Sequence, residues 1–176
     1  SFEARTPVPL EGVAGSTDVF TFSVRESVAN RMLNGDGDKT DTVLTPQDRS
    51  TGRPIPIGAG GAPGRAITQI QQPPFVFPAV ASEDRVIAFL EPEALEATAP
   101  AQADANRDGD TFDTILRVFR EDPSGTAATE LTVAPTFPSP LAVDAALDVN
   151  GRSLAVSNGQ VFFRTPEDGA VGEQAR

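Results

Sequence analysis

The 176-residue sequence predicts an all-β protein with antiparallel sheets, and three observations predict it. Apolar and polar residues alternate at a period of two in several short segments, which is the pattern of half-buried strands. The chain contains 15 Gly and 16 Pro, spread along its length, as expected of a fold rich in turns. Segments with helical periodicity are few and short, and prolines flank the best of them.

The predicted strands follow one another along the chain. They cover residues 19–24, 86–90, 114–119 and 129–133. Glycine-containing turns are predicted at 49–52 and 122–125, where each turn closes a hairpin.

The C-terminal part carries the clearest hairpin signal. Asn-Gly pairs at 150–151 and 158–159 separate three apolar runs between residues 147 and 164. Both central residues of a type I′ turn need a positive φ, which Asn and Gly adopt readily. This pattern predicts a three-stranded meander.

The remaining segments predict little regular structure. Residues 23–32 and 91–103 predict loops with a fragment of helix, and residues 71–78 predict an extended, proline-rich connector at a sheet edge. We expect Glu91, Glu93 and Glu96 on a solvated face rather than as a pair of acid and base catalysts. Arg117 is expected on the exposed face of its strand.

A repeat relates the two halves of the chain. Residues 19–22 align with 86–89, and the acidic stretch 34–44 aligns with 106–116. We therefore divide a single domain, 1–176, into repeat units 19–84 and 86–140 and a C-terminal meander 141–166. Repeats of this size, built from short antiparallel strands, are typical of β-propeller blades. The expected architecture is a partial β-propeller of two to three blades; a β-sandwich built from the same strands is the alternative.

Composition excludes several classes of function. The chain has no His, Cys, Trp or Tyr, so it lacks histidine-based catalysis, thiolate nucleophiles, disulfides and thiolate metal sites. Its net charge of −11 disfavours nucleic acid as a partner. The apolar runs are too short to span a membrane. Carboxylate and amide oxygens remain, and these are the ligands of a hard cation such as Ca²⁺.

Two acidic loops have ligands at the alternating spacing that a calcium loop requires. The second copy offers Asp104, Asn106, Asp108, Asp110 and Asp113, with Gly109 at the bend. The first copy offers Asn34, Asp36, Asp38 and Asp41, but has Met32 at its first position. Converging carboxylates repel one another unless a cation neutralises them. We predict Ca²⁺ in the second loop, and in the first either weaker binding or a plain turn.

The strand containing "AFL", followed by the Asp-rich loop, resembles a blade repeat of secreted bacterial propeller proteins of the TolB-like type. The loop itself is similar to calcium loops in FG-GAP blades, dockerins and thrombospondin repeats. The resemblance spans residues 19–133, and its specific part is the acidic loop. Asp113 at the tenth position departs from both the FG-GAP and the EF-hand patterns. The resemblance implies calcium held between strands, and a role in structure or binding.

These observations predict a non-enzymatic, calcium-stabilised structural or interaction module of a secreted or cell-surface bacterial protein. A bacterial source is suggested by the preference for Arg, Lys39 being the only lysine. The expected partner is a protein, or a second copy reached through sheet edges, and the chain is either part of a longer protein or closes by association. The alternatives are a fragment of a propeller hydrolase or lyase and a calcium-dependent carbohydrate binder. The absence of Tyr and Trp, the usual sugar-stacking residues, disfavours the carbohydrate binder.

Overall fold

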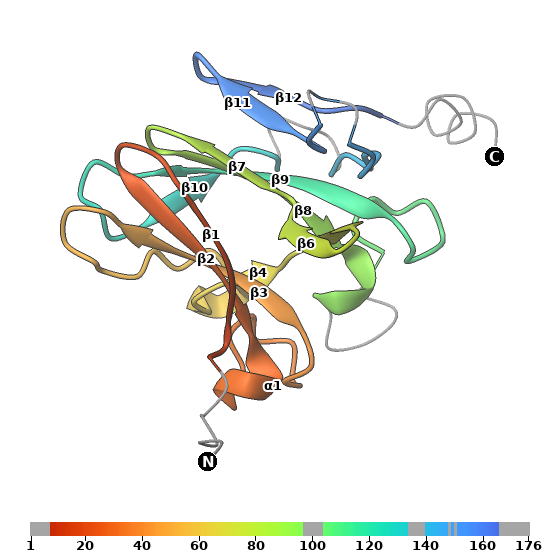
Figure 1. Cartoon of the computed structure of the whole chain (residues 1–176), viewed down its shortest axis with the longest axis horizontal. Coiled ribbons are helices and arrows are strands. Elements are labelled where there is room, and N and C mark those ends of the chain that lie inside the picture. The colour runs from red at the N-terminus through yellow and green to blue at the C-terminus, as the bar shows by residue number, and fades with distance from the viewer. Residues whose placement is uncertain (1–7, 97–103, 134–139, 148, 150, 166–176) are drawn as a thin grey trace.

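A computed structural model of the chain describes residues 8–96, 104–133, 140–147, 149 and 151–165. Within these residues the fold consists of antiparallel strands with almost no helix, which confirms the predicted all-β class (Figure 1). In these described residues, helical structure is limited to one turn, α1 (Glu26–Ala29), and two 3₁₀ turns, η1 (Ala59–Gly61) and η2 (Glu93–Leu95). In the described part of the chain, no helix has the length and apolar character needed to cross a bilayer.

Two four-stranded sheets form the body of the molecule, and in each the strands lie side by side in chain order. The first sheet contains β1 (Leu10–Gly15), β2 (Val19–Arg25), β3 (Thr42–Asp48) and β4 (Arg65–Ala66). The second contains β7 (Val80–Glu83), β8 (Val86–Pro92), β9 (Thr114–Glu121) and β10 (Ala128–Glu130). The strands predicted at 19–24, 86–90 and 114–119 are confirmed, whereas the one predicted at 129–133 ends at Glu130.

The two acidic stretches occupy equivalent places in the two sheets. Each connects the second strand of its sheet to the third, and those two strands are paired along their full length. Arg25 pairs with Thr42 in the first sheet, and Pro92 with Thr114 in the second. Each loop therefore leaves and re-enters its sheet at the same end of a strand pair.

Two hairpins lie outside the main sheets. The prediction of an extended connector at 71–78 is wrong. This proline-rich segment lies in a hairpin, formed by β5 (Gln69–Gln72) and β6 (Phe75–Pro78). At the C-terminal end, β11 (Ala155–Ser157) and β12 (Gln160–Phe162) flank Asn158 and Gly159, whose φ angles of 51° and 70° confirm the predicted turn. The first of the three predicted meander strands, which begins at residue 147, is reduced to a bridge between Val149 and Arg152. Residues 148 and 150 lie outside the described residues.

One hydrophobic cluster lies between the two sheets. It joins side chains of β2, β3 and the chain segments that follow β3 and β4 to those of β8 and β9: Val19, Leu44, Ile55, Ile57, Ile67, Ile87, Phe89 and Phe119. Phe89 and Phe119 stack with ring centroids 6.0 Å apart. The sheets therefore pack on one another, an arrangement that fits a β-sandwich as well as two neighbouring propeller blades. The described residues do not close into a propeller.

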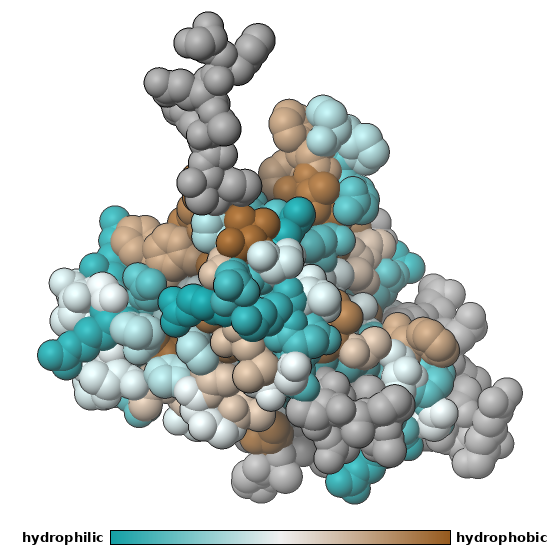
Figure 2. Space-filling model, turned by 90° about the horizontal axis from the view of Figure 1, so that it is seen from below, coloured by the Kyte–Doolittle hydropathy of each residue, from teal (hydrophilic) through white to brown (hydrophobic). Residues whose placement is uncertain are grey.

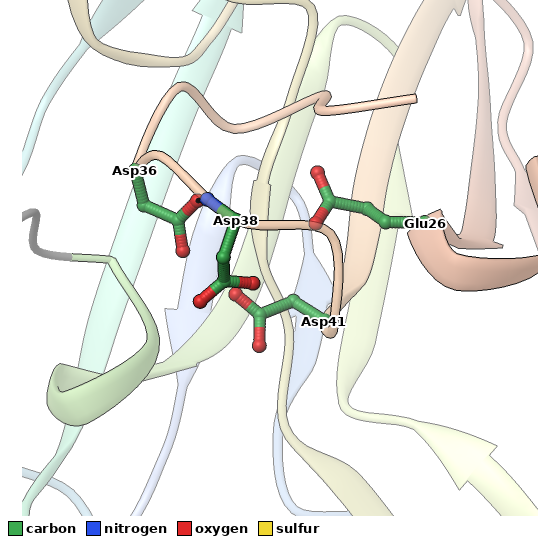
Figure 3. Close-up of side chains that lie close together, drawn as sticks. All are labelled: Glu26, Asp36, Asp38 and Asp41. Atoms are coloured by element: carbon green, nitrogen blue, oxygen red, sulfur yellow. Dashed lines mark hydrogen bonds between the residues drawn. The ribbon is translucent and has the colours of Figure 1, made fainter. Parts of the chain in front are cut away.

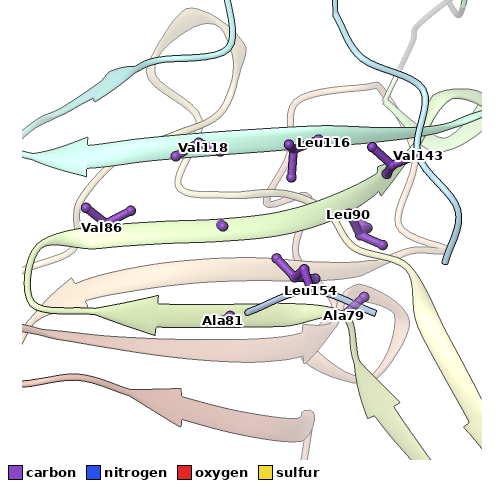
Figure 4. Close-up of a cluster of buried hydrophobic side chains, with 9 residues drawn as sticks. Ala79, Ala81, Val86, Leu90, Leu116, Val118, Val143 and Leu154 are labelled. Atoms are coloured by element: carbon purple, nitrogen blue, oxygen red, sulfur yellow. The ribbon is translucent and has the colours of Figure 1, made fainter. Parts of the chain in front are cut away.

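A second cluster covers the opposite face of the second sheet (Figure 4). Val143 and Leu154, from the C-terminal part, pack there against Leu90 and Leu116. Because both faces of this sheet are covered, six consecutive residues of β8 are buried. Seen from the side of α1, the molecule presents hydrophilic side chains interspersed with apolar ones (Figure 2).

Candidate metal centre

Carboxylates gather at both acidic loops. In the first loop, Glu26, Asp36, Asp38 and Asp41 each place an oxygen within 4.8 Å of the others (Figure 3). In the second, Glu93, Asp110 and Asp113 do the same. Oxygen ligands at such separations suit a hard divalent cation.

A glutamate directly follows the second strand of each sheet and fixes the start of the loop. Glu26 is 0% exposed and Glu93 is 2% exposed. Oε1 of Glu26 accepts hydrogen bonds from the backbone N–H groups of Leu33 and Asn34. Oε1 of Glu93 accepts equivalent bonds from Ala105 and Asn106, at 2.9 and 3.3 Å. Each glutamate thus holds the chain segment that carries the aspartates.

An asparagine then ties the start of each loop to its last aspartate. Nδ2 of Asn34 donates to Oδ2 of Asp41 at 3.2 Å. Nδ2 of Asn106 donates to Oδ2 of Asp113 at 2.7 Å. The two loops therefore close in the same way.

The aspartates between these ends accept bonds from the loop backbone in the same order. Asp36 accepts from the N–H of Asp38 at 3.0 Å, and Asp108 from that of Asp110 at 3.1 Å. Between the members of each pair lies a glycine with positive φ, 110° at Gly37 and 105° at Gly109. Both loops thus share the bend at this glycine.

The first position of the two loops differs. Asp104 uses its oxygens on backbone N–H groups, accepting from Arg107 at 2.6 Å and from Gly109 at 3.1 Å. Met32 takes the equivalent place in the first loop, and its Sδ accepts the N–H of Gly37 at 3.2 Å. The first position therefore shapes the loop backbone in both loops.

The clusters contain some of the predicted ligands and not others. Asp36, Asp38 and Asp41 meet in the first cluster, and Asp110 and Asp113 in the second. Among the described residues, Asp104 and Asp108 are not grouped with the second cluster, while Asn34 and Asn106 act as hydrogen-bond donors within their loops.

Sequence reasoning missed Glu26 and Glu93. A signal for them exists, because Glu26 and Glu93 are 67 residues apart, the same spacing as Val19 and Val86 in the aligned strands. Extending the strand alignment by a few residues would have included them.

The electrostatics of the clusters favour bound positive charge. Burial raises the pKa of Asp41 to about 7, and the neighbouring Asp36 adds to the effect. Burial also raises the pKa of Glu93 and of Asp113, with Asp108 contributing at Asp113. The Thr40 hydroxyl lowers the pKa of Asp38 by donating to its carboxylate. A divalent cation would favour the ionised form of every one of these groups.

The prediction that Glu91 and Arg117 face solvent is wrong, because both lie in a buried charge network. Glu91 is 1% exposed and Arg117 is 7% exposed. Glu91 pairs with Arg117 at 2.7 Å and with Arg65, and Arg117 also pairs with Glu130 at 3.0 Å. These residues lie inside because the first sheet covers this face of β8 and β9. The network joins β4 of one sheet to the other sheet.

No protein-family model, curated protein or solved structure matches this chain. The evidence on function is the geometry of the two carboxylate clusters and the contacts that each loop makes with the sheets.

Proposed function

We propose that the chain is a non-enzymatic structural or interaction module whose acidic loops are stabilised by calcium, within a secreted or cell-surface bacterial protein. The observation that carries the proposal is the pair of carboxylate clusters, which lie at equivalent places in the two sheets and share one hydrogen-bond pattern.

Calcium is the cation that these ligands suit best. Ca²⁺ takes six to eight oxygens in irregular geometry, whereas Mg²⁺ requires a near-ideal octahedron. The clusters offer carboxylates from a strand end and from a glycine-bent loop, and the chain contains no His or Cys to select a softer metal.

A structural role fits the position of the clusters better than catalysis does. Each cluster ties the end of one strand to the loop that leads to the next, so that a bound ion would hold an excursion of the chain in place. Among the described residues, the buried Glu91 is paired with two arginines, which leaves it unsuited to transfer protons.

The same repeated plan supports a partial propeller. Each sheet is an antiparallel four-stranded meander with its acidic loop between the second and third strands. In this proposal the sheets are neighbouring blades. β1 is the last strand of its sheet and lies against β6 and β7, and a protein partner or a second copy could pack on the apolar side chains that it leaves in solvent. Leu10 and Val13 on β1 are 43% and 54% exposed.

Thermal unfolding with and without calcium tests the proposal. A ligand that binds only the folded state at 100 times its Kd stabilises it by about 2.7 kcal/mol. We expect CaCl₂ to raise the Tm relative to EDTA, and Asp36→Asn to reduce this rise. Asp18→Asn, outside both clusters, is the charge-matched control. A Tm that is the same in EDTA and in millimolar CaCl₂ would contradict the proposal.

A further inference from the structure

We infer that the first acidic loop binds Ca²⁺ with Glu26 among its ligands, and that this ion fastens the second sheet to the first. The inference rests on the proposed function and goes further in two respects. It assigns a ligand outside the acidic loop, and it gives the two loops different tasks.

The burial and hydrogen bonding of Glu26 indicate that its carboxylate binds a cation. Its side chain is fully buried, and while Oε1 accepts bonds from the loop backbone, Oε2 is buried without a hydrogen-bond partner. Glu26 belongs to the cluster with Asp38 and Asp41 (Figure 3). A buried carboxylate oxygen without a partner is costly, and a cation among these carboxylates would satisfy it.

Asn34 connects this cluster to the second sheet. It is 1% exposed, and its Nδ2 donates both to Oδ2 of Asp41 at 3.2 Å and to the carbonyl oxygen of Leu95 at 3.1 Å. Leu95 ends η2, and the next residue, Glu96, accepts the backbone N–H of Ala66 on β4 at 2.8 Å. A continuous set of polar contacts therefore runs from the cluster to η2 and back to the first sheet.

Where the first acidic loop meets η2, apolar side chains leave open space beside these polar contacts. A cavity of about 480 Å³ is lined by Asp41 and Leu95, with Ile67 and Thr114 among the other lining residues. An ion that fixes Asp41 would also fix the position of Asn34, and through it the carbonyl group of Leu95.

Within its described residues, 104–113, the second loop shows no equivalent connection. Nδ2 of Asn106 donates to Asp113 at 2.7 Å and to Asp108 at 3.4 Å, both within its own loop. In the described residues, Asn34 reaches η2, which directly follows β8 of the second sheet, whereas Asn106 bonds to no group of the first sheet. The second loop therefore serves as an internal control.

Amide hydrogen exchange with and without CaCl₂ tests the inference. We expect calcium to slow exchange of the Ala66 and Glu96 amides at least tenfold in the wild type. Asp38→Asn and Asp110→Asn are matched variants, since both side chains are exposed and hold the same place in their loops. Asp38→Asn should abolish the calcium-dependent slowing at Ala66, and Asp110→Asn should retain it.

Calorimetric titration with CaCl₂ separates the possible failures. If Asp38→Asn removes one binding event while exchange at Ala66 in the wild type does not respond to calcium, the link between the sheets is overturned and the proposed function stands. If no variant and no wild-type sample binds calcium, both are overturned.

Glu26 has its own test by the same titration. Glu26→Gln should weaken the site removed by Asp38→Asn at least tenfold, and the matched Glu93→Gln should leave that site unchanged. Wild-type affinity in folded Glu26→Gln would overturn the ligand assignment. If circular dichroism shows that Glu26→Gln does not fold, Asp38→Asn still decides the link between the sheets.

Discussion

Glu96 lies where the two sheets meet, and groups from both surround its carboxylate. Oε2 accepts the N–H of Ala66, and Oε1 lies 3.6 Å from Nε of Arg65. Burial raises the pKa of Glu96 to about 8; the nearby Glu91 also raises it, while Arg65 and Arg117 lower it. The folded protein therefore holds a proton that the unfolded chain releases near pH 4.5.

This difference predicts that the protein loses stability as the pH rises. A raised carboxyl pKa contributes stability that is complete below the unfolded value and is lost as the pH rises through about 8. One such group changes the free energy of unfolding by at most about 1.4 kcal/mol per pH unit. Urea denaturation between pH 5 and 9, in saturating calcium so that the loop carboxylates stay ionised, should show this decline.

The Glu96→Gln variant is the control for that experiment, because it keeps a hydrogen-bond acceptor for Ala66 and cannot ionise. We expect its stability to vary less with pH than that of the wild type. Equal slopes for the two proteins would show that another group causes the decline.

Part of the candidate site could be predicted from residue types and spacing. Alternating aspartates around a glycine predicted Asp36, Asp38 and Asp110 because a tight loop turns such side chains to one side. Glu26 and Glu93 could not be identified by loop spacing, since each joins its cluster from the end of a strand. The burial of Arg117 was also missed, because alternation within a strand does not show that a second sheet covers the polar face.

At the scale of elements, the β5–β6 hairpin shows where pattern reasoning has least power. Its two strands meet at Pro73 and Pro74 rather than at an Asn-Gly pair, so the sequence gives a polyproline signal where the chain turns back. The hairpin leaves apolar side chains in solvent: Phe75 is 63% exposed, Val76 43% and Phe77 48%. The two phenylalanine rings lie 6.1 Å apart. By contrast, the strands with period-two alternation and the Asn158–Gly159 turn were predicted, because local sequence determines them.

These exposed rings predict that the hairpin promotes self-association. Phe75→Ser should lower the weight-average mass in sedimentation velocity experiments at high concentration. It should change the free energy of unfolding by only about 0.5 kcal/mol, as is usual at the surface. Val28→Ser, on α1, is the control, since Val28 is 37% exposed and lies in a different element. Equal association of wild type and Phe75→Ser would contradict the prediction.

At the scale of the whole molecule, the second sheet is shared between two cores. Ile87 packs toward the first sheet, and Leu116 packs toward the C-terminal part. The charge network of Arg65, Glu91 and Arg117 crosses the same boundary between the sheets. No pattern within one segment could reveal this arrangement, because it depends on which sheets stack.

A sheet with both faces in a core should unfold in one step with everything packed on it. Ile87→Ala and Leu116→Ala each remove a buried branched side chain, which typically costs about 2–5 kcal/mol. Although the two residues belong to different clusters, we expect both variants to shift the same single transition in calorimetry and in circular dichroism. Two transitions, with Ile87→Ala moving only one of them and Leu116→Ala only the other, would show that the first sheet and the C-terminal part unfold independently. Coincident curves would show instead that the first sheet and the C-terminal part unfold together, because the second sheet packs against both.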